Sequence, residues 1–360
     1  MSRVLIPSLV LTVFGSPMLN PISACMMLQK GYQGRISQNR HQAILIHQGD
    51  NQELILRVNY KIAGANLPNQ FAWIITTPSE PSQYRVAPAN SFQEIGHWAR
   101  RTLSPPRRQP PTRSLSSPVD SPVVESQLIF GKPAKVGPYD IQPVRARGLG
   151  ALQALNTWLT ENGYPTEDPD HMRYFVENGF TFCCVRVSAA AGASGVAANG
   201  ELAPLHLSFK SPKIYYPLLF SSRQGVFDVQ LFVLSEQPLD FRASQQTLTR
   251  LNWRPDKLRR NVRVRAQTFP RALQDIFKKS RVKQPLSGWR LNLLDCRQVN
   301  RGSTIARWKQ DVFLSEGKRT LFGGIPDTPS WLVMVLAGIA GMGLLTGYFR
   351  RQVSRSTPSP

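Results

Sequence analysis

The chain has few acidic residues compared with its basic ones. Of 360 residues, 22 are Asp or Glu and 44 are Lys or Arg, so the formal net charge is +22 at pH 7. The excess is uneven, because residues 241–290 hold fourteen Lys and Arg against two Asp. Such a surface is not neutralised by the chain itself and attracts polyanions.

The predicted polyanion contacts are Arg259, Arg260, Arg263, Arg265, Lys278, Lys279, Arg281 and Lys283. Anionic lipid headgroups or acidic polysaccharide are the expected partners outside the cytoplasm, and nucleic acid inside it. A solvated basic face without a specific ligand is nevertheless the favoured interpretation, and these eight residues are the contacts expected if a polyanion binds.

Cysteine is scarce, and no CxxC spacing occurs, which leaves a zinc knuckle or a thioredoxin-like redox site without support. The four cysteines are Cys25, Cys183, Cys184 and Cys296. Cys183 and Cys184 are neighbours in a predicted strand and point to opposite faces, so a bond between them is not expected. A disulfide from one of them to Cys25 or Cys296 is expected instead, with the other left as a buried thiol.

Recognisable catalytic motifs are also lacking. The histidines have no HxH or HExxH spacing, and there is no GxSxG, GxxxxGK or dinucleotide fingerprint. Asp168 and Asp170 flank Pro169, where a helix start uses acids without needing calcium. The sequence therefore predicts no catalytic, cofactor-binding or metal-binding residue, and it identifies no small-molecule substrate. The histidines are His41, His47, His97, His171 and His206.

One long apolar run is present near the carboxyl end. Trp331–Phe349 holds nineteen residues without a charge and is followed by Arg350 and Arg351. As a helix it would span about 28 Å, close to the thickness of a bilayer core. We therefore predict a transmembrane helix over residues 328–349 that is anchored in the lipid bilayer.

The small residues Gly343 and Gly347 lie on one side of this predicted helix, four positions apart. That spacing allows close helix–helix packing within a membrane. Glycine is common in such helices in any case, so dimerisation through this face is the less favoured interpretation.

The amino end has the layout of a secretory signal peptide over residues 1–24. Arg3 precedes the apolar run Val4–Phe14, and small residues follow at Ser23 and Ala24. Residues 22–25 also resemble a lipobox, which would make Cys25 a lipidated first residue, although a second anchor is redundant beside a spanning helix. The signal predicts an extracytoplasmic domain, with residues 350–360 as a short cytoplasmic tail, in a single-pass protein of the bacterial cytoplasmic membrane.

The sequence between the two apolar ends predicts a predominantly antiparallel α+β fold with a few short helices. Gln42–His47 and Glu53–Tyr60 flank a turn and predict a hairpin whose alternation leaves one face buried, with Ile55 the one apolar residue on the polar face. A capping box from Ser91 to Glu94 predicts a helix. Further strands are predicted at Phe71–Thr76, Phe180–Val187, Leu202–Phe209, Tyr215–Ser221 and Val226–Leu234, and further helices at Leu149–Asn162 and Asp170–Asn178.

Composition divides the chain into regions. Residues 25–101 and 128–240 form the predicted β-rich domain, and residues 102–127 are a Pro/Ser/Arg-rich linker or insert. Residues 241–327 form a basic membrane-proximal region, in which only a helix at Leu273–Lys278 and a strand at Trp289–Leu294 are predicted.

Several segments together resemble the DUF2330 family, bacterial proteins of unassigned function. They are FAWIITTPSEP, VGPYDI, LNTWLTENGYP, YFVENGFTFCCVRV and PLHLSFKSPKIYYPLLFSS, within residues 25–234. The resemblance implies a signal peptide, an early cysteine at the position of Cys25, a β-rich domain and often a carboxyl-terminal spanning helix. It implies no catalytic residue.

The sequence thus predicts a membrane-anchored extracytoplasmic protein that serves as a binding, scaffolding or envelope-associated module, with other envelope proteins among its expected partners. The first alternative is a hydrolase-type enzyme whose site is assembled from distant strands. A pocket with converging acids, histidines or the thiols of Cys183 and Cys184 would favour that alternative. The second alternative is a cytoplasmic nucleic-acid-binding protein with the reverse orientation.

Overall fold

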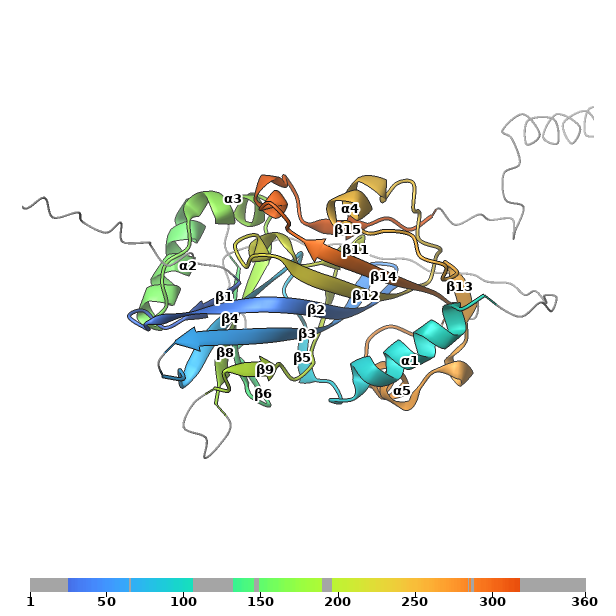
Figure 1. Ribbon diagram of the computed structural model, residues 1–360, viewed down its shortest axis with the longest axis horizontal. Helices are drawn as coiled ribbons and strands as arrows, with labels where there is room; N and C mark the ends of the chain where they lie inside the picture. Colours follow the sequence, from blue (N-terminus) through green and yellow to red (C-terminus); the bar gives the residue numbers. More distant parts are fainter. Residues whose placement is uncertain are drawn as a thin grey trace, which may run out of the picture. The chain divides into compact units, whose positions relative to one another are not determined.

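The longest elements are two strands, β2 (Gly34–Gln48) and β3 (Asn51–Gly64), which pair as an antiparallel hairpin. Gly49 turns the chain between them with a φ of 57°, a value that an L side chain rarely adopts. At about 3.3 Å per residue the hairpin is roughly 45 Å long. Figure 1 shows it crossing the middle of the protein. We call residues 47–53 the turn end of the hairpin.

The computed structural model describes residues 25–64, 66–105, 132–145, 149–189, 196–283, 285 and 288–317. These residues belong to one unit that ends at Gly317. Most of the predicted linker and all of the predicted signal peptide lie outside the described residues, as do the predicted spanning helix and Gly343 and Gly347 within it. None of the helices in the described ranges is long and apolar enough to cross a membrane.

The hairpin is the centre of an eight-stranded sheet with the order β13-β14-β12-β2-β3-β10-β5, to which β9 adds by pairing with β3. Its pairings are antiparallel except that of β12 with β2. The other strands are β5 (Gln83–Val86), β9 (Asn199–Glu201), β10 (Leu205–Lys210), β12 (Phe227–Ser235), β13 (Val262–Val264) and β14 (Trp289–Val299).

A second sheet has five strands, in the order β1-β4-β8-β7-β6, and a third pairs β11 with β15. The predicted strand at Phe71–Thr76 is confirmed as β4, between β1 and β8. The strands are β1 (Met26–Leu28), β4 (Gln70–Thr77), β6 (Ala134–Val136), β7 (Tyr139–Arg145), β8 (Thr181–Ser188), β11 (Ile214–Tyr216) and β15 (Val312–Leu314).

Both faces of the hairpin are buried, contrary to the expectation of one buried face. On β2, Ala43 and Leu45 join the core shared with the five-stranded sheet, whereas Ile44 and Ile46 join a second core. Ile55 belongs to that second core and is fully buried. The apolar residue that interrupts the polar face is therefore explained by the layer of helices that covers it.

That covering layer consists of α1 (Ser91–Leu103) and α5 (Arg271–Lys278), which lie together beside the sheet in Figure 1. α1 buries Phe92, Ile95 and Trp98 as predicted. The remaining helices are α2 (Leu149–Glu161), α3 (Pro169–Glu177), α4 (Gln245–Arg250) and the short η1 (Leu219–Ser221), η2 (Ala266–Thr268) and η3 (Thr304–Arg307).

Two local predictions were wrong. Ser91 does not cap α1: its hydroxyl donates to Pro88 O, Asn90 stands at the cap, and Glu94 accepts from Ala272 N at 3.0 Å in α5. Tyr215–Ser221 is not one strand, because β11 ends before Pro217, which has no N–H to donate. A short helical turn follows it.

The basic region after residue 240 is part of the fold. β13 and β14 extend the eight-stranded sheet, and α5 covers it. Residues 241–317 therefore share the core of the β-rich domain rather than forming a separate stalk.

The second core gives a direct test of this architecture. We expect Ile55→Ala to lower the free energy of unfolding by about 2–5 kcal/mol, because it opens a cavity in a filled layer, and Ile55→Val by about 0.5–1.5 kcal/mol. Denaturant unfolding of the full chain measures both. A loss below about 0.5 kcal/mol for the alanine variant, as at an exposed site, would contradict the two-sided burial.

Candidate functional site

The four cysteines are free thiols, and all four are buried. The bridge expected from Cys183 or Cys184 to Cys25 or Cys296 is absent from the structure. Cys183 and Cys184 occupy β8 in the five-stranded sheet, whereas Cys296 lies in β14 of the other sheet. Burial raises the pKa of Cys25 to about 11 and that of Cys183 to about 12. These thiols are therefore protonated near neutral pH and unsuited to act as nucleophiles.

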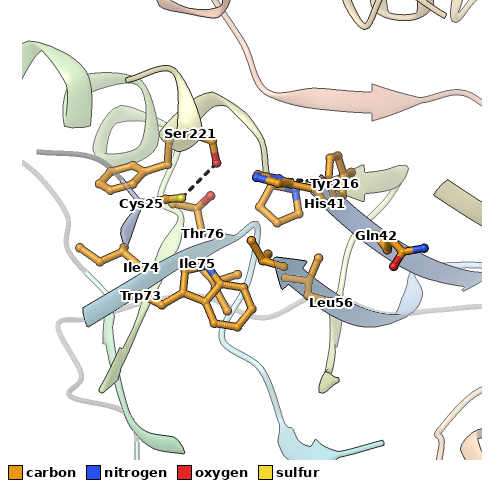
Figure 2. A pocket seen from close by; sticks show the side chains of 13 residues that line it. Cys25, His41, Gln42, Leu56, Trp73, Ile74, Ile75, Thr76, Tyr216 and Ser221 are labelled. Atoms are coloured by element: carbon orange, nitrogen blue, oxygen red, sulfur yellow. Dashed lines mark hydrogen bonds between the residues drawn. The ribbon is translucent and has the colours of Figure 1, made fainter. Parts of the chain in front are cut away.

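Cys25 lines a small cavity together with His41, Tyr216 and Ser221 (Figure 2). Its Sγ accepts hydrogen bonds from Gln38 Nε2 at 2.8 Å and Ser221 Oγ at 3.2 Å. The cavity has a volume of about 20 Å³, enough for about one water molecule.

His41 is a further titratable group at this cavity, beside Cys25 and Tyr216. Its Nδ1 lies 3.3 Å from the Tyr216 hydroxyl, and its ring stacks on Phe227 with centroids 4.3 Å apart. Burial lowers the pKa of His41 to about 3, so the imidazole is neutral. Its Nε2 has no partner within the described residues. This neutral histidine faces a space of molecular-water size, which does not admit a larger substrate.

A chain of hydrogen bonds of the kind found in hydrolases connects Glu167, His171 and Ser222. Glu167 Oε2 lies 2.9 Å from His171 Nδ1, and His171 Nε2 lies 3.1 Å from Ser222 Oγ. We call these three residues the acid–histidine–serine relay. Glu167 lies just before the N-cap Asp168 of α3, His171 lies in the first turn of α3, and Ser222 follows η1. The atoms and distances match those of an activated serine.

The surroundings of the relay differ from those of an active site. Ser222 is 5% exposed, and Glu167 is enclosed as well. Neither the cavity beside Cys25 nor a second cavity beside Glu53 is lined by a relay residue. The His171 ring stacks on Phe220 with centroids 4.7 Å apart. We interpret the relay as a polar clasp that holds α3 against η1.

The sequence analysis did not identify the relay. Glu167 stands four residues before His171, but it precedes the N-cap Asp168 and so lies outside both α3 and the helix predicted from Asp170. The hydroxyl, 51 residues further on, has no sequence signal, since only the tertiary fold brings it close.

The predicted polyanion residues lie on the outer layer of the domain. Seven of the eight are exposed, and Arg263 is partly buried. Setting Arg263 aside, Lys278 is the one member that forms an ion pair with an acid in the part of the chain that the structure describes, with Asp275 at 3.2 Å. Arg260 lies over the rings of Phe241 and Trp253, 5.1 Å from each centroid. The positive charge of this surface is therefore largely uncompensated by the protein itself.

Main-chain hydrogen bonds attach part of this basic surface, residues 281–283, to the turn end of the hairpin. We call these residues the basic segment. Arg281 N donates to Glu53 Oε1 at 2.7 Å, and Lys283 N donates to Gln48 Oε1 at 2.8 Å. Because main-chain groups make these bonds, the side chains of Arg281 and Lys283 remain exposed.

Glu53 is buried and ionised. Burial acts to raise its pKa, but hydrogen bonds from His206 and Ser208 and from Arg281 N hold the pKa below the usual range of a glutamate. The distance from His206 Nε2 to Glu53 Oε2 is 2.7 Å. A cavity of about 40 Å³ lies beside it, lined among others by Glu80, Lys210 and Arg281. Glu53 therefore acts as an internal anion that secures the basic segment.

The chain belongs to the family described as "Uncharacterized protein conserved in bacteria (DUF2330)", whose model matches residues 22–256. This confirms the resemblance found in the sequence. No curated protein matches the chain. Among solved structures, the crystal structure of baculovirus P35 is similar, with 11% identity, 79% of this chain and 98% of that chain covered, and a TM-score of 0.40. A similarity at that level supports no inference about function.

If the relay is a clasp, its serine contributes to stability and not to acyl transfer. We expect Ser222→Ala to cost about 1–3 kcal/mol of unfolding free energy, because it leaves a buried imidazole nitrogen unpaired. A matched change at the exposed Ser37 should stay within about 0.5 kcal/mol. We also expect a fluorophosphonate probe to leave Ser222 of the native full chain unlabelled. Labelling that is lost in Ser222→Ala would overturn the clasp.

The thiols offer a second test. We expect iodoacetamide at pH 8 to leave all four cysteines of the native full chain unmodified, since about one in a thousand thiols with a pKa near 11 is ionised there. All four should react once the chain is unfolded without reductant. A Ser37→Cys variant supplies an exposed thiol as the positive control. A disulfide would show as two cysteines that react in denaturant only after reduction, and any alkylation before unfolding would contradict the burial.

Proposed function

We propose that this protein is a membrane-anchored binding module of the bacterial envelope whose basic surface docks on anionic lipid headgroups. One observation carries the proposal. The exposed basic segment and the last described residues of the domain, 312–317, are both attached to the turn end of the hairpin. We call residues 312–317 the exit segment. The basic segment is held there through Glu53 and Gln48. The exit segment is held there by Glu316, whose Oε2 lies 2.7 Å from His47 Nδ1.

A further contact supports this proximity. Asn261, at the start of the basic strand β13, accepts from Leu239 N at 2.8 Å, and Leu239 forms a bridge with Glu316. The predicted spanning helix follows this exit segment in the sequence. A domain tethered at this point would present its basic segment to the headgroup region.

We expect the basic residues to orient the domain on the membrane rather than to anchor it there. Each Lys or Arg near an anionic surface contributes about 1 kcal/mol, and the attraction fades within a Debye length of about 10 Å at 0.1 M salt. A spanning helix already fixes the domain to the membrane. The charges would therefore set which end of the domain rests on the bilayer.

Headgroup contact can be measured on the full chain reconstituted in vesicles. A fluorophore on Gln274→Cys, an exposed neutral position in α5, reports on the basic surface, while the buried native thiols stay unlabelled. We expect quenching by a nitroxide-headgroup lipid to rise by about twofold or more when phosphatidylglycerol replaces phosphatidylcholine, since the anionic surface attracts the segment. Raising the salt from about 50 to 500 mM should remove the difference.

Two charge-reversal variants separate local attraction from net charge. Arg281→Glu with Lys283→Glu changes the turn end, and Arg35→Glu with Lys61→Glu changes exposed residues at the opposite end of the hairpin. Only the first pair should lose the lipid-dependent quenching. Equal loss in both pairs, or equal quenching in neutral and anionic vesicles, would reject the proposal in favour of a solvated basic face.

A further inference from the structure

His47 is a buried histidine whose two ring nitrogens both face acceptors. Its side chain is 1% exposed. Nδ1 lies 2.7 Å from Glu316 Oε2, and Nε2 lies 3.0 Å from the carbonyl oxygen of Ser211. A carbonyl oxygen cannot donate, so Nε2 carries a proton, and the carboxylate requires a second one at Nδ1. His47 and Glu316 therefore form a buried ion pair.

The charges around His47 act in the same direction. Burial alone would lower its pKa, but Glu316, the carbonyl of Ser211 and the negative charge of Asp50 outweigh it and raise the pKa above the ordinary value of 6.5. Glu316 lies on the exit segment, and Asp50 lies in the turn of the hairpin. The positively charged form is thus favoured by groups from separate elements.

Glu316 also joins the exit segment (residues 312–317) to the loop after β12. Its Oε1 accepts from Gln237 N at 3.2 Å, and the neighbouring Gly317 N donates to Pro238 O at 2.7 Å. Asp240 N donates to Ser315 O at 2.8 Å. The segment is also held by Ser315 N, which donates to Ser244 Oγ at 3.0 Å, by the short pairing of β15 with β11, and by the burial of Val312 and Leu314 in the core.

We propose that His47 and Glu316 form a pH-sensitive latch that holds the exit segment on the domain. A neutral imidazole has one N–H, so after deprotonation either Glu316 or the Ser211 carbonyl faces a lone pair in a site without solvent. The repulsion and the loss of the ion pair weaken the attachment of residues 312–317.

The direction of the pH dependence follows from the raised pKa. The contribution of the latch is fully present below the ordinary pKa of histidine and is lost as the pH rises through the raised value. The exit segment is therefore held most firmly below the raised pKa of His47, and its attachment weakens as the pH rises above that pKa. This inference does not depend on headgroup binding.

Hydrogen exchange of the full chain tests the latch. We expect the protection factor of peptides covering residues 312–317, corrected for the intrinsic pH dependence of exchange, to fall about tenfold or more as the pH rises through the transition, as the linkage predicts. In His47→Gln and in Glu316→Gln the protection should be low and independent of pH.

The second buried histidine–glutamate pair supplies the matched control. His206 binds Glu53 with the same 2.7 Å spacing but does not contact the exit segment. In His206→Gln the alkaline fall in protection of residues 312–317 should persist. The latch is wrong if the wild-type protection is constant with pH, or if His47→Gln and Glu316→Gln retain the wild-type fall. Glu316 is 17% exposed, so its variant perturbs the fold least and keeps the test interpretable.

Discussion

The structure depends on the burial of both faces of the β2–β3 hairpin. Ile44 and Ile55 on one face and Leu45 and Leu54 on the other are fully enclosed. Burying apolar surface stabilises a protein by about 25 cal/mol per Å². Leaving either apolar face of so long a hairpin in water would forgo that stabilisation. Two layers must therefore cover it: the five-stranded sheet on one side, and α1 with α5 on the other. The basic region is folded because it supplies half of the second layer.

The turn end of the hairpin is where this architecture meets the chemistry of the surface. Three neighbouring positions there hold two segments that lie far away in the sequence. Glu53 and Gln48 bind the backbone of the basic segment, and His47 binds the exit segment. Each bond joins residues more than 200 positions apart in the chain. A single turn thus fixes the relative positions of the densest positive charge and the end of the domain.

The sequence predicted those elements whose signals are local. The predicted helices Leu149–Asn162 and Asp170–Asn178 correspond to α2 and α3, and each is followed by a glycine, Gly163 or Gly179, with a φ of 77° or 66°. The hairpin and the strands β4, β8 and β12 also followed from periodicity. In contrast, the three-residue strands β1, β13 and β15 carry too few residues to show a period, and the parallel pairing of β12 with β2 depends on contacts across nearly 200 residues.

The candidate sites divide in the same way. The basic residues could be predicted because charge density is a property of composition, and side chains of that kind remain on the surface. The acid–histidine–serine relay and the His47–Glu316 pair could not, since each needs partners brought together by tertiary folding. The cysteines show the converse error: the expected compartment favours disulfides, but the structure leaves all four thiols free and buried.

The way in which the basic segment is held has a consequence for its function. A protein that used Arg281 and Lys283 for stability would pair their side chains with acids. Here the main-chain N–H groups make the bonds, and the buried carboxylate of Glu53 accepts further hydrogen bonds from His206 and Ser208. The fold therefore positions the segment without consuming its charge. Self-repulsion among exposed cations costs stability, and an external anion that approached this end of the domain would relieve it.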